Sequence, residues 1–149
     1  MKRLAIHTIL SIFLGCLCTF SGHSQEDGLV IVGNKETVPS DLEMDQLVSV
    51  LKGEQLRWRD GSRVSIALMK SNTPVGAATC EKIYNMTGNE LNKYFLAMVF
   101  QGRIKAPTFF NTVSDLETYV SQTPGAIGVL QVTNDENIKV ILVDGKKKI

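Results

Sequence analysis

The fold is decided by the stretch RWRDGSRVSIALMKSNT, residues 57–73. Asp60-Gly61 is a typical turn dipeptide, and the apolar, partly β-branched run 64–69 predicts a buried strand. Ser71-Asn72-Thr73 before Pro74 is typical of the start of a helix. In open α/β sheets, ligands bind just beyond the carboxyl ends of the strands. The predicted ligand site is therefore the polar loop made of Lys70, Ser71, Asn72 and Thr73.

Residues 1–24 are predicted to be a secretory signal peptide. Lys2 and Arg3 precede an apolar run, residues 4–20, which is followed by the small and polar residues of SGHS. This order of charge, apolar run and small residues is typical of export signals. Cleavage is expected after Ser24, so that the protein in the periplasm or outside the cell begins at Gln25. A lipoprotein signal with the lipid on Cys16 is the alternative interpretation.

The composition without this signal argues against a nucleic-acid-binding protein. Without Lys2 and Arg3, 14 of the 16 Lys and Arg residues remain, against 15 Asp and Glu, so the net charge is −1. The 125 remaining residues suffice for one domain with one core. The only basic run, KKK within residues 146–149, is interpreted as a solvated tail. We therefore expect no nucleic-acid partner.

Cysteine and histidine usage excludes several kinds of site. Both histidines, His7 and His23, lie in the predicted signal, and Cys80 is the only cysteine that would survive processing. No intramolecular disulfide, His-based metal site or His-activated nucleophile is then available. Cys80 itself is interpreted as a small buried apolar residue. We therefore predict neither enzyme activity nor a cofactor or metal ion.

Apolar patterns from residue 29 onward alternate between strand and helix types. Continuous apolar runs predict buried strands at 29–32, 64–69, 126–130 and 138–143, and 107–110 is read as an extended connection. Apolar residues three and four apart predict four helices, which begin near Ser40, Pro74, Thr87 and Ser114. The first, second and third helices are expected to end at Gly53, near Met86 and at Gly102. This order predicts a three-layer α/β/α domain with a mixed, mostly parallel sheet.

Three of the helix starts are predicted from capping boxes. The sequences are Ser40-Asp41-Leu42-Glu43, Thr87-Gly88-Asn89-Glu90 and Ser114-Asp115-Leu116-Glu117. In each, the hydroxyl and the carboxylate would satisfy backbone N–H groups that the first helical turn leaves without partners.

Motifs along most of residues 28–145 resemble the second lobe of the periplasmic phosphate-binding protein family, the receptors of phosphate uptake transporters. The resemblance rests on the order and spacing of five segments: Val32-Gly33-Asn34-Lys35; the helix from Leu47 to Gly53 with Trp58-Arg59-Asp60-Gly61; Phe95, Phe100 and Gly102; Pro124-Gly125-Ala126-Ile127-Gly128; and 138–145. It implies a single lobe of the type II periplasmic binding protein fold. The first lobe, which in that family closes over the anion, has no counterpart in the sequence.

The site loop departs from this family. Relatives carry an Arg and then a Ser-Gly-Thr segment at a helix start, where hydroxyl and N–H groups cradle phosphate. Here Lys70 takes the place of the Arg, and Pro74-Val75-Gly76 takes the place of Ser-Gly-Thr. Pro74 has no N–H and Val75 has no hydroxyl. Two interpretations remain for Ser71, Asn72 and Thr73. They either replace the missing phosphate-binding groups from positions nearer the strand, or only cap the helix.

Two other groups of residues are candidates for binding. Trp58 beside the turn is interpreted as the lid of a core rather than a ligand contact. Three arginines, Arg57, Arg59 and Arg63, are expected to alternate along a strand and so to share one face. Asp60 nearby favours the interpretation of that face as a paired, solvated one. An anion patch is the alternative for these three arginines.

Two functional hypotheses follow from the sequence. The first is a periplasmic or secreted component of transport or sensing that binds phosphate or another small oxyanion, weakly or as half of a cleft in a homodimer. The second is a ligand-free adaptor that docks on a membrane transporter or sensor protein. The first requires donors that converge on residues 70–73, and the second requires an exposed apolar patch elsewhere.

Overall fold

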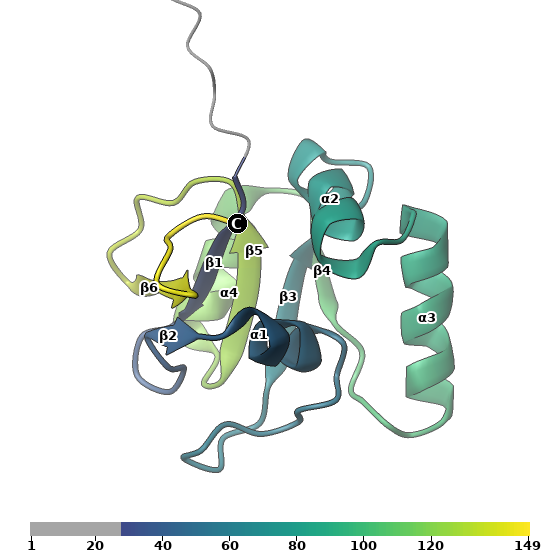
Figure 1. Cartoon of the computed structure of the whole chain (residues 1–149), viewed down its shortest axis with the longest axis horizontal. Helices are drawn as coiled ribbons and strands as arrows, with labels where there is room; N and C mark the ends of the chain where they lie inside the picture. Colours follow the sequence, from purple (N-terminus) through teal and green to yellow (C-terminus); the bar gives the residue numbers. More distant parts are fainter. Residues whose placement is uncertain (1–27) are drawn as a thin grey trace, which may run out of the picture.

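The computed structural model describes residues 28–149, so the predicted signal peptide, its cleavage site and Cys16 lie outside the described residues. Six strands form one sheet in the order β2-β6-β1-β5-β3-β4. Helices cover both faces of the sheet, which gives three layers (Figure 1). In the described part of the chain, no helix has the length and apolar character needed to cross a membrane.

The sheet is mixed, as the sequence predicted. Its strands are β1 (Val30–Asn34), β2 (Asp41–Leu42), β3 (Ser65–Met69), β4 (Thr108–Phe110), β5 (Ala126–Leu130) and β6 (Ile138–Val143). Strand β3 is parallel to both β4 and β5, and β2 is parallel to β6, whereas β1 is antiparallel to both β5 and β6. Three of the five pairings are therefore parallel.

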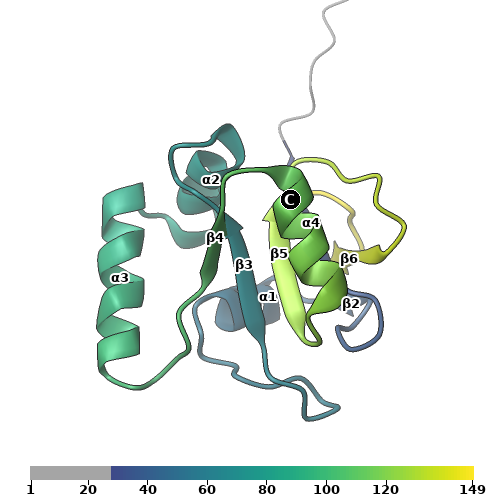
Figure 2. The same ribbon diagram turned by 180° about the vertical axis from the view of Figure 1, so that it is seen from behind.

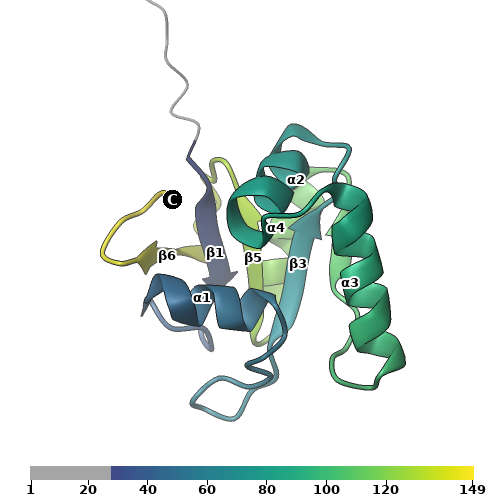
Figure 3. The ribbon, with the colours of Figure 1, turned by 45° about the vertical axis from the view of Figure 1, so that its right-hand side comes forward.

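The helices divide between the two faces of the sheet. Helix α1 (Met44–Leu51), helix α2 (Pro74–Thr79) with the π-helical turn η1 (Cys80–Tyr84), and helix α3 (Gly88–Phe100) lie on one side. Helix α4 (Val113–Gln122) covers the opposite face (Figure 2). Figure 3 shows α3 standing beyond β3, at the end of the sheet where Figure 2 shows β4. The larger core lies beneath α1, η1 and α3, and the smaller one lies beneath α4.

Strand β3 contributes to both cores because its side chains alternate. Ile66 and Leu68 belong to the larger core, and Ala67 and Met69 belong to the smaller one. A strand that is buried on both faces is apolar along its buried part, which explains the apolar run Ile66–Met69 after the half-buried Ser65. The predicted buried strand is confirmed, and its register places Ile66 opposite Ile127 of β5.

Two of the predicted capping boxes are wrong, and one is confirmed. Thr87 and Glu90 form the predicted box at the start of α3. The first box is wrong because Asp41 and Leu42 form β2 and α1 begins only at Met44. The Met44 N–H instead donates to the Asp144 carboxylate at 3.1 Å.

The third box is displaced by two residues. Helix α4 is capped by Thr112, whose hydroxyl accepts from the Asp115 N–H at 3.2 Å, and Ser114 already lies within the helix. The geometry of Thr112, with φ −122° and ψ 149°, is the extended conformation that a capping residue needs. Local sequence alone leaves several hydroxyl residues competing for this position.

Tyrosines from η1 and α3 satisfy the carboxyl end of α1. The Tyr84 hydroxyl donates to the Leu51 carbonyl at 2.9 Å, and the Tyr94 hydroxyl donates to the Lys52 carbonyl at 2.8 Å. The last carbonyls of a helix have no donor within it, so these bonds replace water at a buried end. Burial raises the pKa of Tyr84 far above its ordinary value, so the hydroxyl stays protonated and remains a donor.

Replacing Tyr84 with Phe is expected to lower the free energy of unfolding by about 1–3 kcal/mol, because the buried Leu51 carbonyl would lose its partner. Urea denaturation of the purified variant measures this loss. Tyr119→Phe is the matched control, since the Tyr119 hydroxyl makes no hydrogen bond with residues 28–149. Equal midpoints for the two variants would contradict a stabilising role for the Tyr84 bond.

Candidate functional site

The predicted site loop, residues 70–73, joins the carboxyl end of β3 to the start of α2. The Lys70 N–H donates to the Phe110 carbonyl at 2.9 Å, which ties the loop to the end of β4. Strands β3, β4 and β5 run parallel, so their carboxyl ends share one edge of the sheet. The loop thus lies at the edge where ligands bind in open α/β sheets.

Thr73 has a structural role in this loop. Its hydroxyl donates to the Lys70 carbonyl at 2.7 Å and accepts from the Gly76 N–H at 3.0 Å. It is therefore the N-cap of α2, with Pro74 at the first helical position as the sequence predicted. Both hydrogen-bonding directions of this hydroxyl are in use within the protein.

The other three side chains of the loop are available to a ligand. Lys70 and Asn72 are exposed and Ser71 is half-buried. None of the three side chains forms a hydrogen bond or ion pair within residues 28–149. Together they offer an ammonium group, a hydroxyl and an amide, which are all able to donate to an anion.

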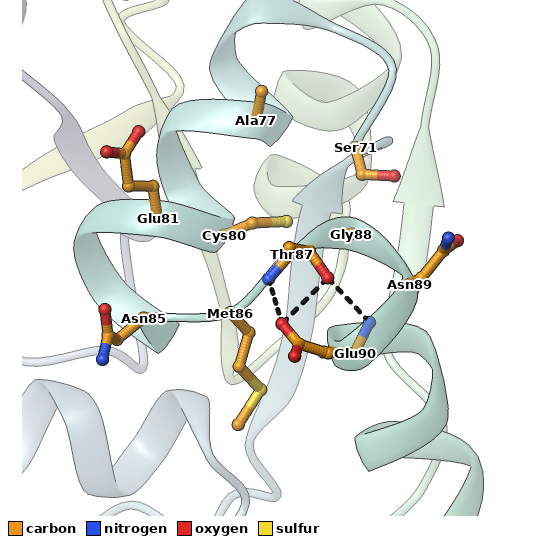
Figure 4. A pocket seen from close by; sticks show the side chains of 10 residues that line it. All are labelled: Ser71, Ala77, Cys80, Glu81, Asn85, Met86, Thr87, Gly88, Asn89 and Glu90. Atoms are coloured by element: carbon orange, nitrogen blue, oxygen red, sulfur yellow. Dashed lines mark hydrogen bonds between the residues drawn. The ribbon is translucent and has the colours of Figure 1, made fainter.

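Ser71 also lies beside the start of α3. A Cβ atom on Gly88 would lie 2.6 Å from the Ser71 hydroxyl oxygen, so only glycine allows this approach. The two segments line an open pocket of about 580 Å³, with η1 forming the far wall (Figure 4). The capping box of α3 was predictable from the sequence, but no local pattern indicated that this helix start adjoins Ser71.

The charge of this pocket disfavours an anion within it. Its lining includes the carboxylates of Glu81 and Glu90 and contains no Lys or Arg. Glu90 accepts from the Thr87 N–H at 2.7 Å and from the Thr87 hydroxyl at 2.8 Å, as Figure 4 shows. These bonds hold the pKa of Glu90 below its ordinary value, so its carboxylate already occupies the start of α3. An oxyanion would have to bind on the Lys70 side of Ser71.

The structure places Trp58 in the core and the arginines around a turn. Trp58 belongs to the core, as predicted: it is only 4% exposed, and its Nε1 donates to the Gly125 carbonyl at 2.9 Å. The arginines do not follow one strand, which corrects the sequence interpretation. The chain reverses between Arg57 and Arg63, and these two residues pair across the turn in an antiparallel bridge.

The described residues contain no cluster of three or more metal-ligating side chains. Cys80 is buried, and burial raises the pKa of its thiol above the ordinary value, which lowers its reactivity.

Comparisons with known proteins identify the fold without identifying a family. No protein-family model and no curated protein matches the chain. The solved structures with a similar fold include an ABC-type phosphate transport receptor from Vibrio cholerae, 16% identical, with a TM-score of 0.65 over 83% of this chain and 49% of that one. The chain has the fold of a periplasmic binding protein lobe.

Two further structures agree. A protein described as a phosphate ABC transporter substrate-binding protein with bound phosphate, from Clostridium perfringens, is 16% identical, with a TM-score of 0.64 over 80% of this chain and 46% of that one. PstS from Borrelia burgdorferi is 14% identical, with a TM-score of 0.60 over 80% and 48%. This protein therefore spans about half of the length of the receptors whose fold it shares.

Proposed function

We propose that this protein is a periplasmic or secreted binding lobe, residues 28–145, that contacts phosphate or a similar small oxyanion through Lys70, Ser71 and Asn72. The observation that carries the proposal is the presence, at the carboxyl edge of the parallel strands, of three donor side chains that have no partner within residues 28–149. The receptor fold and the bound phosphate named for one structural neighbour support the choice of anion. Thr73 orders the loop. The basic tail, residues 146–149, is held to the domain by backbone hydrogen bonds between Ile149 and Leu29.

The proposed contact is weak because one lobe leaves the anion facing water. Two-lobed receptors exclude water around the ligand, which strengthens each hydrogen bond. Here Pro74 cannot donate a backbone N–H, and Lys70 is exposed to screening by salt. A second copy of the chain, or a membrane transporter or sensor protein, would supply the missing wall.

Phosphate is expected to bind the monomer with a Kd no better than about 1 mM, or about −4 kcal/mol. Titration calorimetry, with the mass measured in parallel, tests this value. Lys70→Ala is expected to weaken binding at least about fivefold, since it removes the only cation of the loop. Lys147→Ala in the exposed tail is the matched control and should leave the affinity unchanged.

Two results would contradict this proposal. Micromolar phosphate binding by a confirmed monomer would show that one lobe forms a complete receptor site. Equal affinities of the Lys70→Ala and Lys147→Ala variants would remove the loop from the binding site.

The second candidate function, an adaptor that docks on another protein, is favoured by one specific observation. The outer face of α3 carries an apolar patch of three residues: Leu96 is 58% exposed, Val99 is 37% exposed and Phe100 is 82% exposed. They occur at helical spacing, so they share one face. Contiguous exposed apolar side chains of this kind are typical of interaction sites.

A further inference from the structure

A basic pocket lies at the opposite end of β3 from the oxyanion loop. It has a volume of about 430 Å³ and lies between two segments, 56–64 and 102–105. Four exposed cations line it, namely Arg57, Arg63, Arg103 and Lys105. Leu56, Val64 and Ile104 contribute its apolar surface.

The cations of this basic pocket have no anionic partner in the described part of the protein. None of the four forms an ion pair with a carboxylate of residues 28–149. The Arg57 guanidinium donates to the Gly61 carbonyl at 2.7 Å, and this bond fixes the turn that brings Arg57 opposite Arg63. No Asp or Glu is among the lining residues. Four like charges around one hollow repel one another, and an anionic ligand would relieve that repulsion.

The apolar patch on α3 extends this surface. Phe100 ends α3 two residues before Gly102, which lines the basic pocket. Leu56 is 48% exposed within the pocket itself. The surface thus combines apolar groups with exposed cations. A partner that carries carboxylates for the cations and an apolar side chain for the apolar groups would complement it.

We propose that the basic pocket and the α3 patch form a docking surface for an acidic segment of a partner protein, in which an apolar side chain is flanked by carboxylates. The hollow shape decides the class of partner. An extended peptide segment can enter between segments 56–64 and 102–105 and meet cations on both sides. A flat bilayer would reach only the rim of the pocket. This proposal gives a site to the adaptor function and does not depend on oxyanion binding.

Fluorescence anisotropy with a labelled heptapeptide, Gly-Glu-Glu-Phe-Glu-Glu-Gly, tests the proposal on the purified protein. The peptide is expected to bind at low ionic strength and to dissociate as salt is added, because salt screens exposed charges. Replacement of its Phe by Ser is expected to weaken binding about threefold or more, and replacement of its Glu residues by Lys should abolish binding.

The decisive variant is Arg63→Glu with Arg103→Glu, since neither side chain forms a hydrogen bond or ion pair within residues 28–149. Peptide affinity is expected to fall at least tenfold while the melting temperature stays unchanged. Lys146→Glu with Lys147→Glu changes the net charge equally at a distant exposed site and should alter affinity less than twofold. Lys70→Ala should leave peptide binding intact, which separates this test from that of the oxyanion loop.

Several outcomes would overturn the proposal. Equal losses in the two charge-reversal variants would show attraction to net charge alone, and absence of peptide binding would remove the site. Co-sedimentation with phosphatidylglycerol vesicles that depends on Arg63 and Arg103, without peptide binding, would assign the surface to membranes. A dimer that dissociates in the Arg63→Glu, Arg103→Glu variant would assign it to a second copy of the chain.

Discussion

Leu68→Asp is expected to lower the free energy of unfolding by about 4 kcal/mol or more, enough to unfold a large part of a domain of ordinary stability. Leu68 is 1% exposed, lies within β3 and belongs to the larger core. A carboxylate at this position would be buried without a partner, because the surrounding core cluster is apolar. Urea or thermal denaturation followed by circular dichroism measures the loss.

The matched control is Leu96→Asp, the same chemical change at a site that is 58% exposed on α3. It should cost about 1 kcal/mol or less, mainly through the lower helix propensity of Asp. If Leu68→Asp melts like the parent protein, β3 is not the buried strand on which the fold depends.

Gly76→Ala is expected to have a comparable effect by a purely steric route. A Cβ atom at position 76 would lie 2.0 Å from the Lys70 carbonyl oxygen and 2.7 Å from the Met69 carbonyl oxygen. Both contacts are with backbone, so α2 would have to move away from the end of β3. We expect a loss of about 3 kcal/mol or more in unfolding free energy, together with displacement of the loop at 70–73.

Gly61→Ala separates this clash from backbone strain. Gly61 has φ +86°, but no atom lies within 4 Å of the point where its Cβ would be, so alanine there meets strain without collision. Its expected cost is about 1–2 kcal/mol. Urea denaturation of both variants would contradict the steric argument if Gly76→Ala proved no less stable than Gly61→Ala.

The parts of the fold that could be predicted from sequence are those set by local pattern. The apolar run of β3 and the box at Thr87 carry their information within a few residues, and both are confirmed. Gly53 and Gly102 end their helices with φ +76° and +68°, a conformation that glycine adopts readily. These features need no knowledge of distant segments.

Features that depend on distant residues could not be predicted in this way. The α1 start is capped by Asp144, which is 100 positions away in sequence, and Ser40 instead precedes the short strand β2. The predicted helix ends in the π-helical turn η1, which directly follows α2 and carries Tyr84, whose hydroxyl reaches the end of α1. Neither arrangement leaves a local pattern.

The candidate site likewise has one part that local sequence predicted and one part that depends on distant residues. The position of residues 70–73 after β3 followed from the strand pattern and the helix start at Pro74. The pairing of Ser71 with Gly88 did not, because the two residues meet only once α3 has packed beside α2. In the basic pocket, Arg103 and Lys105 lie beside Arg57 and Arg63. This arrangement likewise depends on a distant contact, the packing of Ile104 against Gly53.

The two outermost strands limit the ways in which this protein can polymerise. Strand β2 has two residues and β4 has three, so each edge offers few free backbone groups to an incoming strand. Pro39 precedes β2 by two residues and Pro107 directly precedes β4, and neither can donate a backbone hydrogen bond. Growth into fibres by strand addition is therefore blocked at both ends of the sheet, and molecules crowded together would meet through side chains instead.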